Sequence, residues 1–180
     1  MIKTGSMESL KASYNKGRTV PEFLEMARGS EHPWEDFNQR ARLPREVLPR
    51  LQDLTGQWHF LVLCEEWCGD GANSLPYLAR AVEFAPGLEM RILPRDENPH
   101  LMDTHLTNGN RGIPVVMILD EAFREVAWWG PRPAPLQDLF IREILPLPKE
   151  ERYPRVRAWY ARDRGRTALE EILQGIPVPV

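Results

Sequence analysis

The stretch Glu66-Trp67-Cys68-Gly69-Asp70-Gly71 connects an apolar run to a helical pattern and decides how the chain is interpreted. The preceding residues 58–64 are apolar apart from one histidine. This run is too short for a long helix, so it predicts a strand covered on both faces. Apolar residues between positions 75 and 82 then recur at helical spacing until Pro86-Gly87. Cys68 is therefore expected where a buried strand gives way to a helix.

A thiol at the start of a helix has a physical reason to be reactive. Unpaired backbone N–H groups and the positive end of the helix macrodipole favour its thiolate form. The carboxylates of Glu65, Glu66 and Asp70 oppose this effect, because nearby negative charges disfavour a second anion. No lysine or histidine is adjacent in the sequence to compensate. We therefore predict a modestly activated thiol at Cys68.

The segments after this junction alternate between strand and helix. Residues 88–93 predict a second strand, Asn98-Pro99 introduces a short helix, and residues 115–119 predict a third, buried strand. Residues 123–129 follow after a short turn, which requires an antiparallel neighbour, and residues 136–145 predict a further helix. The order β-α-β-α-β-β-α predicts the α/β class, with a central mixed sheet of about four strands flanked by helices.

The chain is long enough to fold around one hydrophobic core. It has 180 residues, of which 42% are hydrophobic. We predict a single domain at residues 8–180, with a core at 54–146 and helical extensions at 8–53 and 147–180. Residues 1–7 are featureless and are interpreted as a leader or a remnant of the expression vector.

Composition argues against several classes of partner. The net charge of −3 gives no reason to expect binding to nucleic acid or an anionic membrane. No apolar stretch approaches the roughly 20 residues that span a bilayer, and no secretory signal is visible, so a cytoplasmic location is predicted. The histidines lack metal-ligand spacing and no cysteine cluster joins them, so no metal site is predicted: His32, His59, His100 and His105.

The other cysteine, Cys64, is predicted to be a buried apolar residue at the end of the first strand. If the segment between Cys64 and Cys68 is extended, four steps of about 3.3 Å place the two Cα atoms roughly 13 Å apart. A disulfide requires a separation below about 7 Å. On this geometry the two cysteines are not expected to form a bond.

Several features of the chain resemble the thioredoxin fold. Trp67-Cys68-Gly69 stands at the strand-to-helix junction, and Pro76 lies eight residues after the cysteine, where thioredoxins kink the same helix. Arg111-Gly112-Ile113-Pro114 is similar to the cis-proline loop that faces the active-site cysteine, and Gly130 fits the glycine that lets the last hairpin approach this loop. Within the superfamily, the chain most resembles a bacterial thioredoxin-like group with a Trp-Cys-Gly-Asp motif. Further signatures of that group are matched by Arg95-Asp96-Glu97-Asn98-Pro99, Leu106-Thr107-Asn108-Gly109 and Trp129-Gly130-Pro131-Arg132-Pro133.

The resemblance implies a site centred on Cys68 as the catalytic nucleophile. The residues it implies for substrate binding are Trp67, Gly69, Asp70, Gly71, Ile113 and Pro114. Trp67 would form an apolar wall, and the backbone of Ile113 would pair with an extended peptide. Two positions depart from the family pattern. Gly71 replaces the second cysteine of the familiar Cys-x-x-Cys arrangement, and Val62 occupies the position of a buried acid that assists proton transfer.

These observations predict a monothiol oxidoreductase acting in thiol–disulfide exchange or deglutathionylation. An external thiol would release the mixed disulfide, because Gly71 cannot. No cofactor is expected, and glutathione or another small thiol would serve only as a co-substrate. The expected partners are protein thiols and disulfides or a small thiol, and Arg111 or Arg132 could bind a carboxylate such as glutathione's. The alternatives are a non-catalytic binding or adaptor domain and a peroxide-reactive cysteine.

Overall fold

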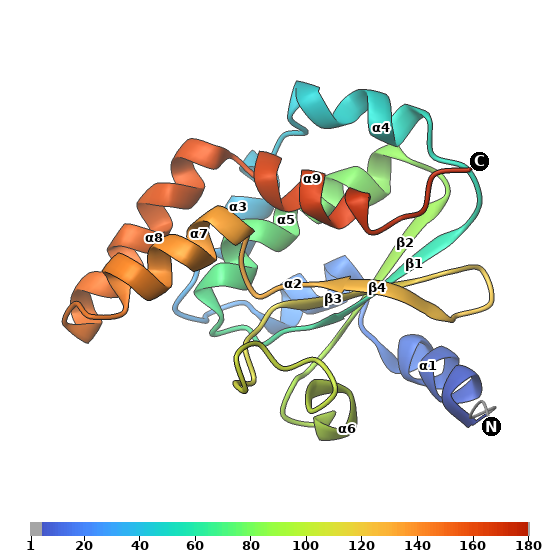
Figure 1. The fold of residues 1–180 in the computed structure, drawn as a ribbon, viewed down its shortest axis with the longest axis horizontal. Helices are drawn as coiled ribbons and strands as arrows, with labels where there is room; N and C mark the ends of the chain where they lie inside the picture. The colour runs from blue at the N-terminus through green and yellow to red at the C-terminus, as the bar shows by residue number, and fades with distance from the viewer. Residues whose placement is uncertain (1–4, 180) are drawn as a thin grey trace.

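A four-stranded sheet forms the centre of the molecule (Figure 1) in the computed structural model, which describes residues 5–179. The strands are β1 (Trp58–Leu63), β2 (Leu88–Leu93), β3 (Val115–Leu119) and β4 (Glu125–Trp129), in the order β2-β1-β3-β4. β1 is parallel to β2 and antiparallel to β3, and β4 is antiparallel to β3. The predicted mixed α/β sheet is therefore confirmed.

Helices cover both faces of this sheet. The α-helices are α1 (Gly5–Lys16), α2 (Val20–Met26), α3 (Trp34–Arg40), α4 (Leu48–Gln52), α5 (Gly69–Phe84), α6 (Pro99–Met102), α7 (Ala134–Leu139), α8 (Lys149–Asp163) and α9 (Arg166–Gln174). A 3₁₀ turn, η1 (Arg45–Val47), precedes α4, and a π-helical turn, η2 (Phe140–Ile144), follows α7. In Figure 1, α4 and α9 lie on one side of the sheet, and α1 and α6 lie on the other.

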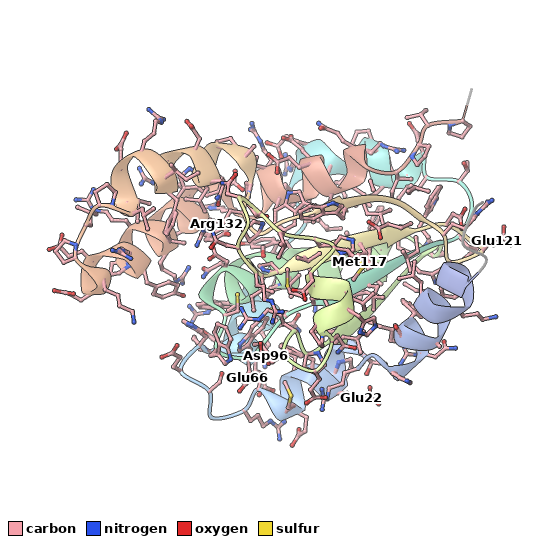
Figure 2. All side chains as sticks on the ribbon, turned by 60° about the horizontal axis from the view of Figure 1, so that its bottom comes forward. Glu22, Glu66, Asp96, Met117, Glu121 and Arg132 are labelled. Carbon is pink, nitrogen blue, oxygen red and sulfur yellow. The ribbon has the colours of Figure 1, made fainter. Side chains whose placement is uncertain are left out.

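The two inner strands form the core because they consist almost entirely of apolar side chains. All five residues of β3 are buried, as are all residues of β1 except Trp58. Figure 2 labels Met117 in the middle of the molecule, where its side chain is fully buried. Such strands, covered on both faces, hold the loops at their ends in fixed positions.

The helical extensions pack against the core near the end of β1 that leads to Cys68. Helix α3 from the N-terminal extension and helix α8 from the C-terminal extension both contact α5. Helix α8 begins at Lys149, and it continues through Pro154. Helix α5 likewise continues through Pro76. The extensions therefore contribute side chains around the start of α5.

Helix α1 begins at Gly5, so part of the stretch interpreted as a leader is helical. Residues 1–4 lie outside the described residues, and the interpretation of 1–7 as a leader stays a prediction. Among the helices of residues 5–179, none is both long enough and apolar enough to span a membrane.

Candidate active site around Cys68

Cys68 is the N-cap residue of α5, as the sequence predicts. Its backbone is extended, and the Gly71 N–H donates a hydrogen bond to its Sγ at 3.3 Å. On its other side, the Cys68 thiol donates to the carbonyl oxygen of Ile113 at 3.4 Å. Cys68 as a whole is 6% exposed. The sulfur therefore lies between the first turn of a helix and the loop that precedes β3.

The loop that faces Cys68 is held by a close backbone contact. The Ile113–Pro114 peptide bond is cis. Gly130, at the end of β4, has a φ of 135° and packs directly on the Pro114 carbonyl, where a Cβ atom would collide with the backbone. A side chain at position 130 would be excluded both by this contact and by the positive φ. Glycine here lets the last hairpin support the loop that contacts Cys68.

Trp67 forms an exposed wall beside the thiol, with 43% of its surface accessible. The Arg95 guanidinium lies 5.0 Å from the centre of its ring, a cation–π contact. The loop after β2 is tied to the loop after β1, because the Asp96 N–H donates to Glu65 Oε1 at 3.0 Å. Figure 2 shows Glu66 and Asp96 at this junction of the two loops. Trp67 thus has a defined position next to the sulfur.

Asp70 is not a free surface carboxylate. Its Oδ1 accepts hydrogen bonds from Arg132 Nε and from the Tyr160 hydroxyl, both at 2.9 Å. Burial raises the pKa of the Asp70 carboxyl above its ordinary value, although the Arg132 charge and the two hydrogen bonds oppose this shift. Arg132, labelled in Figure 2, also lies over the Phe140 ring at 3.9 Å. The cation that compensates Asp70 therefore comes from a distant loop.

The helical extensions supply further support for the site. Trp34 is buried and donates its indole N–H to the Glu66 carbonyl oxygen at 2.7 Å. His32 Nε2 lies 3.1 Å from the Trp67 carbonyl oxygen, and its ring packs on that of Tyr153 from α8. Tyr153 in turn covers Gly69 and accepts a hydrogen bond from Asn73. The backbone of residues 66–69 is thus held from both extensions.

The segment between the two cysteines is a turn, so the extended geometry on which their estimated separation depended does not apply. The Cys68 N–H donates to the Glu65 carbonyl oxygen at 3.0 Å, which folds the chain back. An ideal Cβ built on Gly71 would lie 2.5 Å from Sγ of Cys64 and 3.5 Å from Sγ of Cys68. The two sulfurs therefore lie within about 6 Å of each other. Both thiols are free in the structure.

Burial raises the pKa of the Cys64 thiol well above its ordinary value, and the neighbouring Cys68 side chain raises it further. Cys64 is 1% exposed, and its thiol is within hydrogen-bond reach of the Glu65 carbonyl oxygen at 3.5 Å. Cys64 therefore keeps its proton in the resting protein. Its prediction as a buried residue is confirmed, but its position next to Cys68 was not expected.

The structure brings most of the predicted site residues together. Cys68, Ile113 and Pro114 meet across the site, and Trp67 lies at its edge. Gly71 is buried against Cys64 and Trp34. Val62 is fully buried in β1. Arg111 forms an ion pair with Asp103 at 2.8 Å. Within residues 5–179, no group of three or more potential metal ligands is present.

Sequence reasoning missed the residues that hold the site from the extensions. Trp34, Tyr153 and Tyr160 contact residues 66, 69 and 70, which lie 32, 84 and 90 positions away in the sequence. No local pattern reports such contacts. The one available signal was the presence of large aromatic residues in otherwise polar helices, such as Tyr153 and Tyr160 in α8.

The sheet order, the thiol at the start of α5 and the facing Ile113–Pro114 loop define a thioredoxin-like protein. A family model described as Thioredoxin matches residues 17–150 of the chain. This match spans most of the sequence, and the chain therefore belongs to that thioredoxin family. The predicted membership of the thioredoxin-like superfamily is confirmed. No curated protein matches the chain significantly in sequence.

Two solved structures share this fold over nearly the whole chain. A crystal structure of a protein of unknown function from Pseudomonas aeruginosa has a TM-score of 0.71 and 23% sequence identity, covering 91% of this chain and 93% of that chain. The crystal structure of an HIV epitope scaffold has a TM-score of 0.69 and 21% identity, covering 92% of this chain and 95% of that chain. Identities this low show the fold alone. The likeness extends beyond the central sheet into the helical extensions.

Proposed function

We propose that this protein is a thiol–disulfide oxidoreductase in which Cys68 is the attacking nucleophile. The observation that carries the proposal is the position of its sulfur. The sulfur accepts a hydrogen bond from the Gly71 N–H at the start of α5 and lies 3.4 Å from the carbonyl oxygen of Ile113. A hydrogen bond from an N–H group and the positive end of a 16-residue helix both stabilise a thiolate. Placement within the Trp-Cys-Gly-Asp group is part of the same proposal.

The first chemical step is attack by the Cys68 thiolate on a substrate disulfide. A bond forms between Cys68 Sγ and one substrate sulfur, the substrate S–S bond breaks, and the other substrate sulfur leaves as a thiolate. The product is a mixed disulfide between Cys68 and the substrate. Over a full catalytic cycle the reducing equivalents come from outside the chain, and glutathione or another small thiol is the co-substrate we propose for this role.

The surroundings of Cys68 favour a disulfide carried on a peptide or on glutathione. Trp67 offers an exposed apolar surface beside the sulfur. The backbone of Ile113, on the opposite side, can pair with an extended peptide once a substrate displaces the Cys68 thiol from its carbonyl oxygen. Arg132 is already paired with Asp70, and Arg111 with Asp103, so neither is assigned to a substrate carboxylate.

The test is reaction of the native protein with oxidised glutathione, followed by acid quenching and peptide mapping by mass spectrometry under non-reducing conditions. Because Cys68 is the more exposed thiol of the pair, at 6% against 1% for Cys64, the Cys64→Ala variant is expected to gain one glutathione at Cys68. The matched Cys68→Ser variant, which keeps the buried Cys64, is expected to gain none. A Cys68 that reacts only after the protein has been unfolded would overturn the proposal and favour the non-catalytic adaptor domain.

A further inference from the structure

The space that a resolving cysteine would fill in this fold is occupied by the sulfur of Cys64. In a Cys-x-x-Cys arrangement the second thiol is attached to the Cβ atom of residue 71. Here residue 71 is glycine, and Cys64 Sγ lies 2.5 Å from that Cβ position. The Cys68 sulfur is 3.5 Å from the same point. A thiol therefore stands near the expected place, but it projects from the end of β1 instead of from α5.

We propose that Cys64 is the resolving thiol of this protein and that Cys64 and Cys68 form a catalytic dithiol with the spacing Cys-x-x-x-Cys. The proposal rests on the proposed function of Cys68 and adds the group that completes its reaction within the chain. Gly71 then has a specific role, because its missing side chain leaves the space in which the two sulfurs meet. The turn at residues 65–68 brings the two cysteines to this space.

The second step follows from the first with atoms and electrons in balance. Cys64 loses its proton, and its sulfur attacks Cys68 Sγ of the mixed disulfide. A Cys64–Cys68 bond forms, the bond between Cys68 and the substrate sulfur breaks, and the departing thiolate takes up a proton. The substrate disulfide has gained two electrons and the protein dithiol has lost two. Two equivalents of a small thiol such as glutathione return the protein to its dithiol form.

The surroundings of Cys64 suit this order of events. In the resting protein, burial is the largest cause of the raised pKa of the Cys64 thiol, and the neighbouring Cys68 side chain adds to it. The charge of an ionised Cys68 disappears when that sulfur enters a mixed disulfide. The pKa of Cys64 then falls, because the Cys68 charge no longer adds to burial and the Glu65 charge in opposing its ionisation. Cys64 therefore becomes easier to deprotonate at the step in which it must attack.

The sulfurs need only a short movement to bond. They are within about 6 Å of each other, and a disulfide requires a separation of roughly 2 Å. Rotation of the Cys68 side chain away from the Ile113 carbonyl oxygen moves its sulfur without displacing either strand. No side chain at position 71 obstructs this movement.

The experiment treats the folded wild-type protein and the folded Cys64→Ala variant with oxidised glutathione, and compares them by the same non-reducing peptide mapping. We expect the wild type to yield a Cys64–Cys68 linked peptide and to release two glutathione thiols per protein. We expect the variant to stop at the Cys68–glutathione adduct and to release one. A wild-type protein that keeps glutathione on Cys68 and forms no internal bond would overturn the role of Cys64 while leaving the proposed function intact.

Absence of any adduct or internal bond in both proteins would overturn the role of Cys64 together with the proposed function. The wild-type peptide map answers the question by itself if the Cys64→Ala variant does not fold. A substrate-linked Cys64 peptide would contradict the assigned order of attack.

Discussion

Gly71 and Cys64 are in contact so close that they exclude any larger residue at position 71. A Cβ atom there would lie 2.5 Å from Cys64 Sγ and 3.1 Å from the Trp34 ring. Both neighbours are buried and cannot move into solvent. Gly71 stands where a Cys-x-x-Cys motif has its second cysteine. The Cys64 thiol occupies the space beside this position, so position 71 requires glycine.

Gly71→Ala is expected to lower the free energy of unfolding by about 1–3 kcal/mol, because it inserts a methyl group into a packed core. The loss should be smaller in a Cys64→Ala background, where the sulfur that meets the new methyl group has been removed. Urea unfolding of the two single variants and the double variant measures this coupling. Equal losses in both backgrounds would contradict the contact.

Arg132→Met is expected to destabilise the protein by about 3–5 kcal/mol at neutral pH, because it leaves the Asp70 carboxylate buried without its ion-pair partner. Without the Arg132 charge, the pKa of Asp70 rises further. Protonation then relieves the unpaired charge, so the deficit should shrink as the pH falls. Urea unfolding at neutral and acidic pH checks this. The double variant Asp70→Asn/Arg132→Met is the control, and its deficit should be smaller at neutral pH and should not shrink as the pH falls, because it has no carboxyl group at position 70.

Trp34→Phe is expected to cost about 1–3 kcal/mol, since it leaves the Glu66 carbonyl oxygen without its 2.7 Å indole donor. It should also slow mixed-disulfide formation at Cys68, because the turn that carries the thiol loses a support. Trp58→Phe is the matched control. This substitution removes the 2.9 Å hydrogen bond from the Trp58 indole N–H to the Thr55 carbonyl oxygen, at the other end of β1. It should leave the reaction at Cys68 unchanged. Equal effects on that reaction would refute a positioning role for Trp34.

His105 predicts a pH dependence of stability away from the thiol. Burial lowers the pKa of His105, but hydrogen bonds to Glu125 (2.9 Å) and the Leu101 carbonyl oxygen (2.7 Å) outweigh it, so the pKa is raised. The native state therefore binds its proton more tightly than the unfolded state. The stabilisation is fully present below about pH 6.5 and is lost as the pH rises through the folded pKa.

Urea unfolding of wild type and His105→Gln between about pH 6 and pH 9 checks this dependence. The wild type should lose stability across this range relative to the variant, in which the titrating group is absent. The other groups near the ring are the Thr104 hydroxyl and the edge of Trp128, and neither titrates in this window. A difference between the two proteins that does not change with pH would contradict the raised pKa.

The strands were predictable because each is a short, mostly apolar segment bounded by turn-forming or charged residues. Residues 88–93 and 115–119 agree with β2 and β3 at both ends. The π-helical turn at Phe140–Ile144 was not predictable, because its apolar residues also fit a continuous α-helix. The strands were therefore predictable from the local sequence pattern. The π-helical turn depends on packing that the local sequence does not encode.

The site was predictable where a residue's role depends on its place along the chain. Cys68 and Pro114 are of this kind, since one starts a helix and the other precedes a buried strand. The partners of Asp70 were not found, because Arg132 and Tyr160 lie 62 and 90 positions away. The proximity of Cys64 was missed because Glu65-Glu66-Trp67 contains no glycine or proline to signal a turn.

The most direct test of the central claim is catalytic turnover at Cys68. The measurement is reduction of a peptide–glutathione mixed disulfide by excess glutathione, followed over many equivalents per protein. The wild type is expected to turn over repeatedly, and Cys68→Ser is expected to fall to the rate of glutathione alone. Equal rates for the wild type, Cys68→Ser and glutathione alone would contradict the assignment of this protein as a thiol–disulfide oxidoreductase.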